Sequence, residues 1–446
     1  MSPIEDLRGL YQPFATDRSV QRVAMISVHT SPVAVLGGRD AGGLNVYVRE
    51  LSHQLDRCGV NVDIFTRRED EHTADVVHMS DRVRVVTINA GPRWPAPKND
   101  VYGLLPEFAS EVALYSLLSG ARYDIVHSHY WLSGWASHLI TRYWSAPTVH
   151  TFHTLARLKN NVVGAGQQES ALRLETEQRL LSVMDNIVAP NPDERAEMVW
   201  RMGAENSHIC VIPPGVDLDR FHPHDSRSAR QTLDLPENPI VLFVGRVDPM
   251  KGIETLIDGF AALRHQQRWT NLPPKLVFIG GSLVPTPNGP VPGPDLQPVI
   301  ERARQLGVLE DIVFKGSEPQ DLLPDYYAAA TVCAVPSRYE SFGLVAVEAM
   351  ACGLPVVASR AGGLKFTVEE DISGILVPPN DPGALAEALG RIIRDPDLRA
   401  SMRVGARQAA IRFSWQTIGP AMLNLYERLA EGHRENLCCL GDVYAS

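Results

Sequence analysis

Short apolar segments alternate with amphipathic segments along most of the chain. The apolar segments are rich in β-branched residues, as in Ile240–Val244, which favours strands covered on both faces. The segments between them place apolar residues at helical spacing. We expect strands at Arg22–Val28, Val60–Thr66, Ile125–His127, Thr148–His150, Asn186–Ala189, Ile240–Val244, Lys275–Ile279, Ile312–Lys315, Val332–Val335, Pro355–Ala358 and Gly374–Val377, and helices at Leu44–Arg57, Leu172–Ser182, Gly252–His265 and Pro382–Arg394.

This alternation predicts an α/β fold with parallel sheets and helices on both faces. Prolines and a glycine interrupt the pattern at Ile212–Phe221, between a strand and a polar stretch. We therefore expect two Rossmann-like domains facing each other across a cleft, at residues 1–215 and 216–412. Residues 413–446 are expected to form a C-terminal helical segment that can cover either domain, packing back on the N-terminal domain being one arrangement. The segment Val284–Pro298 is interpreted as a loop insertion.

Ligands of open α/β sheets bind at the carboxyl ends of the strands, so polar residues there are candidates for a site. In the second domain, one predicted strand is followed by Glu340, and Glu348 lies on the helix that comes next. Glu340 can accept hydrogen bonds from sugar hydroxyls, and Glu348 can bind both hydroxyls of a ribose. The N–H groups of Phe342, Gly343 and Leu344 open the helix, where an anion is favoured. Two unrelated surface carboxylates are the alternative interpretation.

A cationic turn follows the predicted strand Ile240–Val244. Arg246 can contact two phosphate oxygens through its planar guanidinium, and Lys251 adds a point charge. Gly245 and Gly252 allow the backbone to come close to a ligand. A diphosphate fits this turn, although the spacing alone also fits solvated surface charges.

A glycine-rich segment, Gly37–Asn45, precedes the first predicted helix of the first domain. Glycines ahead of a helix N-terminus let a phosphate approach backbone N–H groups. The spacing is not Gly-x-Gly-x-x-Gly, and the second strand ends in Thr66-Arg67-Arg68 without an acidic residue. A dinucleotide-dependent oxidoreductase is therefore disfavoured. A purely structural turn stays open as an alternative.

Neither the histidines nor the Asp-x-Asp patterns predict a metal site. The histidines are spaced by two or three residues on different strands and have no carboxylate cluster beside them. The patterns at 217–219 and 395–397 do not directly follow a strand of the second domain, so they are interpreted as structural. The histidines at the strand ends are His127, His129, His150 and His153.

Composition narrows the class of protein. A net charge of −10 argues against a general binder of nucleic acid or anionic membranes. We find no apolar run of the roughly 18 residues that span a bilayer and no signal-peptide pattern, which favours a cytoplasmic protein. The six cysteines include no Cys-x-x-Cys pair, so free thiols are expected.

The second domain as a whole resembles glycosyltransferase family 4, whose members are retaining and have the two-Rossmann GT-B fold. Each motif is weak alone, but together they occur in the order of that family. The matching motifs are Gly245-Arg246, Lys251-Gly252, Gly280-Gly281, Tyr339–Leu344, Glu348–Gly353, Pro355–Ala358, Gly362-Gly363 and Gly374–Val377.

The resemblance implies roles for individual residues. Arg246 and Lys251 would neutralise the donor diphosphate, Glu340 would contact the transferred sugar and Glu348 the ribose. The glycine-rich loop would reach the diphosphate from across the cleft, His153 would lie beside the reacting sugar, and Lys315–Glu318 would hold the base. The implied catalytic residues are His153, Arg246, Lys251 and Glu340, and the implied donor-binding residues are Gly42, Gly43, Arg246, Lys251, Phe342, Gly343, Leu344 and Glu348.

The first domain looks like a narrower group, the inositol-phosphate glycosyltransferases of the mycothiol pathway, and more distantly like sucrose-phosphate synthases. Both groups hold an acceptor phosphate in a basic pocket. The segment Gly37–Asp40 departs toward the sucrose-synthesis pattern, which leaves the acceptor open, and solvated surface cations are an alternative. The implied acceptor-binding residues are Asn45, Lys98, Tyr130, Thr154 and Arg173.

Together these features predict a retaining, metal-independent enzyme that transfers glucose or N-acetylglucosamine from a UDP-sugar to a small phosphorylated polyol or sugar. No cofactor is expected besides the nucleotide-sugar co-substrate. Nucleic acid and stable membrane insertion are not expected, and the oligomeric state is open, including a homodimer. Two alternatives stand: the same fold with an unphosphorylated or lipid acceptor, and a non-catalytic nucleotide-sugar-binding protein.

Overall fold

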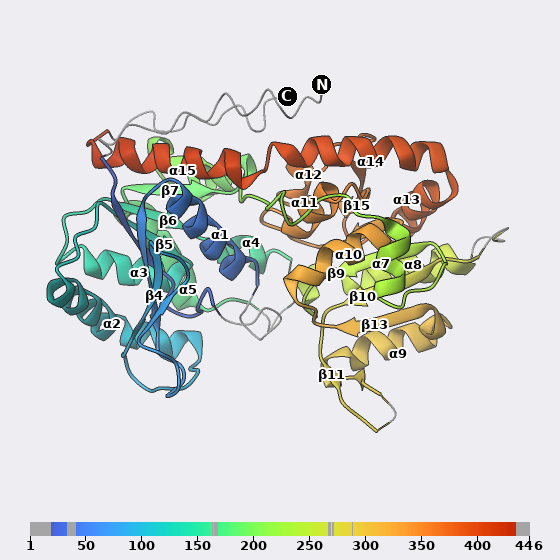
Figure 1. Ribbon diagram of the computed structural model, residues 1–446, viewed down its shortest axis with the longest axis horizontal. Coiled ribbons are helices and arrows are strands. Elements are labelled where there is room, and N and C mark those ends of the chain that lie inside the picture. The colour runs from blue at the N-terminus through green and yellow to red at the C-terminus, as the bar shows by residue number, and fades with distance from the viewer. Residues whose placement is uncertain are drawn as a thin grey trace.

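The computed structural model describes residues 19–33, 42–162, 164, 168–265, 269, 272–287 and 289–433. Two lobes lie side by side, each built on its own sheet with helices on both faces (Figure 1). This arrangement confirms the predicted α/β fold with two Rossmann-like domains.

The first sheet has the order β3-β4-β2-β1-β5-β6-β7-β8, and all neighbours are parallel except the pair β3–β4. Its strands are covered on both faces, so the residues of β1, β2 and β5 are buried almost without exception. Its strands are β1 (Arg22–Ile26), β2 (Asn61–Arg67), β3 (Val76–His78), β4 (Val83–Ile88), β5 (Ile125–His129), β6 (Thr148–Thr151), β7 (Asn186–Ala189) and β8 (Ile209–Val211), and its helices are α1 (Gly43–Arg57), α2 (Lys98–Ser119), α3 (Trp131–Ile140), α4 (Ala156–Asn160), α5 (Ala171–Val183) and α6 (Pro192–Ala196).

The second sheet has the order β13-β10-β9-β14-β15-β16 and is parallel throughout. Aspartates begin several of its helices by accepting a backbone N–H of the first turn, as Asp381 does from Ala384 at 2.9 Å. Its strands are β9 (Ile240–Val244), β10 (Lys275–Ile279), β13 (Ile312–Gly316), β14 (Val332–Val335), β15 (Val356–Ser359) and β16 (Gly374–Val377), and its helices are α7 (Ser226–Thr232), α8 (Ile253–His265), α9 (Gln297–Gln305), α10 (Leu323–Ala329), α11 (Leu344–Ala351), α12 (Leu364–Thr367), α13 (Pro382–Arg394) and α14 (Pro396–Ile411).

The last helix, α15 (Trp415–Ala430), returns to the first lobe, whereas α14 lies on the second (Figure 1). Its Trp415 and Tyr426 are buried in the same core cluster as Tyr47 of α1. The chain crosses between the lobes twice, and the crossings pair where Val216 N–H donates to the Phe413 carbonyl at 2.7 Å. Gly215 makes this possible, because a Cβ there would lie 2.4 Å from the Trp415 ring.

Two expectations about elements need correction. The sequence pattern missed β3, β4 and β8, although β4 and β8 are buried strands of the first sheet. The segment Val284–Pro298, expected as a loop, contains the second strand of a short antiparallel pair, β11 (Leu283–Val284) with β12 (Val291–Pro292), and the start of α9. β3, β8, β11 and β12 have two or three residues each, too few for a period to be read, whereas β4 has six residues and was missed despite its length.

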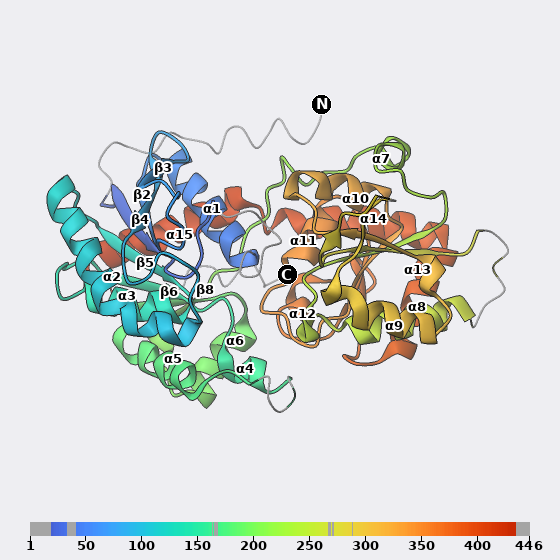
Figure 2. The same cartoon turned by 90° about the horizontal axis from the view of Figure 1, so that it is seen from below.

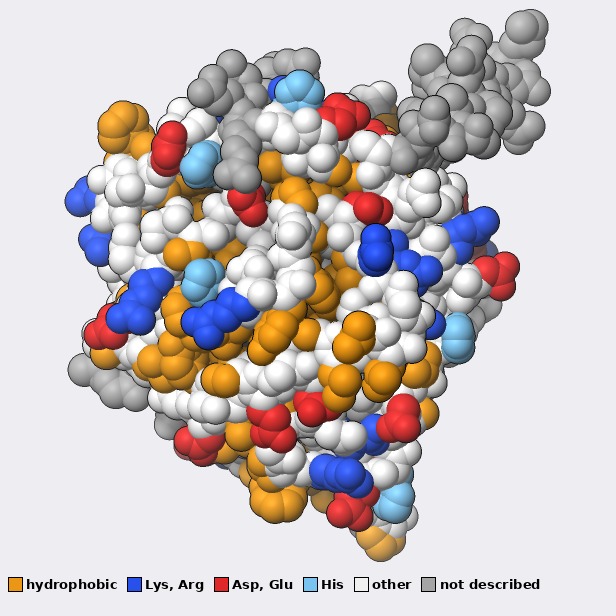
Figure 3. Space-filling model, turned by 90° about the vertical axis from the view of Figure 1, so that its left-hand side faces the viewer, with side chains coloured by type: hydrophobic (Ala, Val, Ile, Leu, Met, Phe, Trp, Pro, Cys, Tyr) orange, Lys and Arg blue, Asp and Glu red, His pale blue; other side chains and the backbone are white. Residues whose placement is uncertain are grey.

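The surface of the first lobe carries charges of both signs (Figure 3). On the face of the first lobe shown in Figure 3, Lys and Arg side chains are interspersed with Asp and Glu side chains, with hydrophobic side chains between them. Within the ranges that the structure describes, no helix is both long and apolar enough to cross a bilayer.

Candidate active site

Lys251 and Glu340 form an ion pair at the carboxyl edge of the second sheet. Lys251 Nζ donates to Glu340 Oε2 at 2.6 Å, and the two side chains keep 23% and 18% of their surface exposed. Gly252 (φ +66°) brings the two turns together, since a Cβ there would lie 1.9 Å from the Pro336 carbonyl oxygen. The pair is therefore preformed and still accessible to a ligand.

The Glu340 loop is fixed by its own domain as well. Ser337 Oγ donates to Glu340 Oε2 at 3.3 Å, and the Gly363 N–H donates to the Glu340 carbonyl at 2.8 Å. A Cβ at Gly362 would lie 2.1 Å from that same carbonyl oxygen, so glycine is required for the close approach. The Gly362-Gly363 motif thus serves to position the Glu340 backbone.

The amino end of α11 faces the glycine loop of the first domain. A Cβ built on Gly43 would lie 3.3 Å from Leu344 Cδ1, and one on Gly42 would lie 4.0 Å from Arg246 Nε. Figure 2 shows α1 and α11 approaching each other between the lobes. The exposed guanidinium of Arg246, the N–H groups that open α11 and the amino end of α1 therefore face one space, which suits an anion.

Phe342 and Glu348 are both buried. The Phe342 ring packs edge-on against Phe413 with centroids 5.4 Å apart, so only its backbone is left for a ligand. Glu348 is 6% exposed and accepts a hydrogen bond from Tyr327 Oη at 2.9 Å. Burial raises the pKa of Glu348 to about 7, against the opposing effect of the hydrogen bonds from Tyr327 and Gln320. A ribose diol that donates to this carboxylate would favour its ionised form.

His153 follows β6 in a left-handed backbone conformation (φ +61°) and lies within a group of rings. Its Nε2 is 3.2 Å from Nδ1 of His129, and its ring meets that of Tyr47 edge-on at 5.0 Å. Burial lowers the pKa of His153 to about 3. The imidazole is therefore neutral near pH 7 and can act as a hydrogen-bonding group.

The other candidate metal ligands have structural partners. His127 contacts Tyr426 Oη of α15 at 2.5 Å, and Asp217 and Asp395 accept backbone N–H groups of the residues that follow them. Within the described parts of the chain, no three His, Cys, Asp or Glu side chains are grouped to hold a metal ion. The four described cysteines, Cys58, Cys210, Cys333 and Cys352, form no disulfide with one another.

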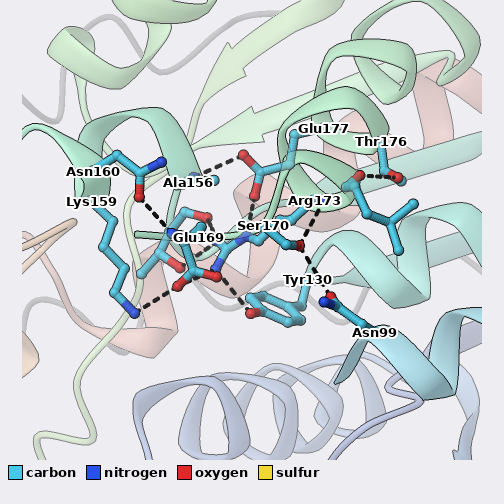
Figure 4. Close-up of polar contacts among 12 residues, drawn as sticks. Asn99, Tyr130, Ala156, Lys159, Asn160, Glu169, Ser170, Arg173, Thr176 and Glu177 are labelled. Carbon is cyan, nitrogen blue, oxygen red and sulfur yellow. Dashed lines mark hydrogen bonds and ion pairs between the residues drawn. The ribbon is translucent and has the colours of Figure 1, made fainter. Parts of the chain in front are cut away.

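Four of the expected acceptor residues, Lys98, Tyr130, Thr154 and Arg173, meet around the Tyr130 ring. Figure 4 shows Arg173 beside Tyr130. Arg173 donates to Tyr130 Oη at 3.0 Å and to Thr154 Oγ1 at 3.1 Å, while its Cζ lies 4.7 Å from the ring centroid. Lys98 Nζ lies 5.3 Å from the same centroid. The first domain therefore gathers two cations and two hydroxyl groups at the carboxyl ends of β5 and β6.

Arg173 is enclosed rather than open to solvent. It is 2% exposed, and its Nε donates to Glu177 Oε1 at 2.6 Å. Its Nη1 lies 3.1 Å from Glu169 Oε1, which also accepts from Lys159 Nζ at 2.6 Å (Figure 4). An anion reaching Arg173 would have to share or replace the Glu169 carboxylate, so a direct phosphate contact by Arg173 stays a prediction.

Asn45 is occupied within the loop that precedes α1. Its Oδ1 accepts from Gly42 N–H at 3.2 Å, and its Nδ2 donates to Thr30 Oγ1 at 2.7 Å and to the Ser31 carbonyl at 2.6 Å. The side chain is fully buried. These hydrogen bonds fix the amino end of α1, and a contact between Asn45 and the acceptor stays a prediction. The segment Gly37–Asp40 lies outside the described residues.

Comparison with known proteins agrees with this geometry. A family model described as Glycosyltransferase Family 4 matches residues 41–220, and one described as Glycosyl transferases group 1 matches residues 225–409. The chain is 41% identical over 414 residues to D-inositol 3-phosphate glycosyltransferase of Xylanimonas cellulosilytica, covering 91% of this chain and 96% of that protein. The chain belongs to this glycosyltransferase family.

Two further similarities extend over nearly the whole chain. D-inositol 3-phosphate glycosyltransferase of Corynebacterium jeikeium is 39% identical over 421 residues, covering 93% of this chain and 98% of that protein. The solved structure of sucrose-phosphate synthase from Thermosynechococcus elongatus superposes with a TM-score of 0.83 at 36% identity, covering 92% of this chain and 100% of that one. The GT-B fold and the two expected resemblances are therefore confirmed.

Some residues of this glycosyltransferase site were not found from the sequence. Lys159 and Glu169 complete the ring around Arg173, and Asn191 and Glu194 reach the Glu340 loop from the first domain. Asn191-Pro-Asp-Glu194 matches a helix start, with a capping Asn, Pro at the first position and Glu at the third. That signal could have found α6, but nothing in it indicates a contact between domains.

Proposed function

We propose that this glycosyltransferase is retaining and metal-independent, and that it moves glucose or N-acetylglucosamine from a UDP-sugar to a small phosphorylated polyol or sugar. The donor would lie between Gly42-Gly43 and the carboxyl edge of the second sheet. The acceptor would lie beside the Tyr130 ring of the first domain.

The observation that carries the donor assignment is the Lys251–Glu340 pair beside Arg246. A diphosphate brought next to Lys251 would compete for its charge and leave Glu340 free to accept hydrogen bonds from the sugar. The amino end of α11 adds backbone N–H groups to the same space. Two cations and a helix dipole can thus supply the charge stabilisation that other transferases obtain from a metal ion.

Two findings support a phosphorylated acceptor. The relatives' names specify inositol 3-phosphate as substrate, and the structural neighbour is named for a sucrose phosphate. Lys98 and Arg173 converge on one ring with two hydroxyl groups at hand. Charge-assisted contacts of this kind discriminate strongly against an acceptor without the phosphate group, because the cations of the site would then stay unpaired.

The chemistry proposed is substitution on one face of the sugar. The bond from the anomeric carbon to the β-phosphate oxygen breaks, the acceptor oxygen bonds to that carbon on the same face, and the leaving phosphate takes the acceptor's hydroxyl proton. Arg246 and Lys251 stabilise the charge left on the diphosphate. Glu340 would orient the sugar, and neutral His153 would hydrogen-bond a sugar hydroxyl.

A donor–acceptor matrix read by mass spectrometry in EDTA tests this proposal. The donors are UDP-glucose, UDP-N-acetylglucosamine and GDP-mannose, and the acceptors are inositol phosphate, fructose 6-phosphate and their unphosphorylated forms. We expect product only from a UDP-sugar with a phosphorylated acceptor. Product only without phosphate would contradict the acceptor assignment, and loss of all product in EDTA would contradict metal independence.

The enclosure of Arg173 is the observation that favours the second candidate, transfer to an unphosphorylated acceptor. In that case Arg173, Glu169 and Glu177 would form a structural ion-pair network and no anion would enter. The two acceptor columns of the matrix separate the candidates.

A further inference from the structure

The loop that carries Glu340 is held by the opposite domain. Glu340 has Tyr339 before it and Ser341 after it, and these two neighbours are buried while Glu340 itself stays accessible. Both neighbours contact residues that follow β7 in the first domain. The catalytic glutamate therefore sits between two anchors that belong to the interface between domains.

Glu194 of α6 is the centre of this interface. Its Oε1 accepts hydrogen bonds from Tyr339 Oη at 2.6 Å and from Ser341 Oγ. Asn191 Nδ2 donates to the Ser341 carbonyl at 2.6 Å, while Asn191 Oδ1 accepts the Glu194 N–H at 2.9 Å. Asn191 and Glu194 thus form one unit that grips the loop through a side chain on each flank of Glu340 and through one carbonyl.

This grip is built as a buried polar network. Glu194 is 2% exposed, and Asn191 is fully buried. Burial raises the pKa of Glu194 to about 7, and the hydroxyls of Ser341 and Tyr339 oppose that rise. A buried carboxylate is destabilising unless its hydrogen-bond partners stay in place. These hydrogen bonds therefore favour the arrangement in which the loop stays against α6.

A second contact across this interface is exposed to solvent. Lys365 of α12 pairs with Asp193 across the same interface, but the two side chains are 36% and 47% exposed. Exposed pairs contribute little because water screens them. Asp193 therefore offers a matched control, one residue away and across the same interface.

We propose that Glu194 is a positioning residue for the transfer reaction, acting through Tyr339 and Ser341 to set the position of Glu340. The proposal rests on the proposed function in that Glu340 is taken to contact the donor sugar. The sugar part of the donor site is then complete only while α6 of the first domain holds the loop. The hydrogen bonds of Glu194 and Asn191 to the loop reach Tyr339 and Ser341, and not Arg246, Lys251 or Glu348, which form the nucleotide part.

The test compares Glu194→Ala with Glu194→Gln and with the control Asp193→Asn. We expect Glu194→Ala to lower kcat/KM for the UDP-sugar about 10- to 100-fold, the range for lost hydrogen bonds to a charged group, while the Kd for UDP alone stays within about twofold. Glu194→Gln keeps an accepting oxygen and should recover most of the activity. Asp193→Asn should behave as wild type.

A double-mutant cycle with Ser341→Ala separates positioning from general stability. If Glu194 acts through Ser341, the double variant loses little more activity than Glu194→Ala alone, so the two losses are not additive. If Glu194→Ala does not fold, the same double-mutant cycle is made with two milder substitutions, Glu194→Gln and Tyr339→Phe.

Three results would overturn the proposal: wild-type donor kinetics in Glu194→Ala, additive losses in the cycle, or loss of UDP binding in proportion to loss of turnover. Failure of the proposed function has a different signature, since wild-type protein would then bind no UDP in the same titration.

Discussion

The proposed donor side and the proposed acceptor side hold their charges in opposite ways. The side chains of Lys251 and Glu340 are partly exposed and pair with each other. Arg173 is enclosed, with Glu177 on one nitrogen and Glu169, Tyr130 and Thr154 on the others. The Lys251–Glu340 pair is thus accessible to a ligand that could replace one partner, whereas the contacts of Arg173 join residues inside the first domain.

This difference means that an accessible cation such as Lys251 and an enclosed cation such as Arg173 need different tests, even though both are expected to bind phosphate groups. Removing an accessible cation subtracts a ligand contact, whereas removing an enclosed cation leaves buried carboxylates without a partner. Four substitutions or titrations separate these cases, from the largest expected effect to the smallest.

Arg173→Ala should have the largest effect, and on folding. Glu177 is almost fully buried, and breaking such a pair costs about 3–5 kcal/mol. We expect that loss in the free energy of unfolding measured with urea, together with a raised acceptor KM. Arg179→Ala, an exposed arginine of the same helix, is the control and should change stability by less than about 0.5 kcal/mol. Equal stability in both variants would show that the enclosure contributes nothing.

Lys251→Ala should act on turnover rather than on folding. We expect a loss of about 2–4 kcal/mol of transition-state stabilisation, read from kcat/KM for UDP release in EDTA. Lys275→Ala removes a cation from the amino end of β10, opposite to the site, and should leave kcat/KM unchanged. Wild-type turnover in Lys251→Ala would contradict the donor assignment.

Lys98→Ala sharpens the contrast within the acceptor side. The Lys98 ammonium lies over the Tyr130 ring, and the residue is only partly buried. We expect its loss to raise the acceptor KM by the equivalent of about 1.5–3 kcal/mol, the range for a hydrogen bond to a charged group. The free energy of unfolding should change far less than in Arg173→Ala. An unchanged acceptor KM would remove Lys98 from the site.

The pH dependence of UDP binding should show the smallest effect. Because burial raises the pKa of Glu348 from 4.5 to about 7, its contribution to stability is present below pH 4.5 and fades as the pH rises to 7. The proposed ribose contact needs the carboxylate, so between about pH 6 and pH 7 the UDP affinity should rise by at most about tenfold and then level off. Glu348→Gln should abolish the slope in a calorimetric titration, and a persisting slope would assign it to another group.

Much of the fold was readable from the sequence because its strands are apolar on both faces and well separated. All eleven expected strands are present, and β7, β9, β10, β14 and β16 have the predicted bounds. The edge strand β3 and the short β8 gave no usable period, since pairing with a neighbour, rather than local pattern, makes them strands. The helical segment after Phe413 was expected, but its choice of domain depends on packing against α1.

The candidate site was readable only as far as local motifs reach. Arg246 and Lys251 follow β9, Glu340 follows β14 and Glu348 lies on the next helix, α11, so sequence order alone places them near one edge of the sheet. The roles expected of Asn45 and Arg173 depend on which partners occupy their nitrogens. Glu177 is four residues from Arg173 on the same helix, but Thr30, which contacts Asn45, and Tyr130, which contacts Arg173, are distant in the chain. Glu194 lies far from Ser341 in sequence, and only docking of the two domains brings them together.

The central claim is that the two sides of the cleft bind a UDP-sugar and a phosphorylated acceptor without a metal. The most direct test is the ratio of kcat/KM for inositol 3-phosphate to that for inositol, measured in EDTA with the UDP-sugar that the matrix selects. Loss of charge-assisted phosphate contacts predicts a ratio of at least about 100. A ratio near one would contradict the account, because the enclosed Arg173 and its neighbours would then have no part in choosing the acceptor.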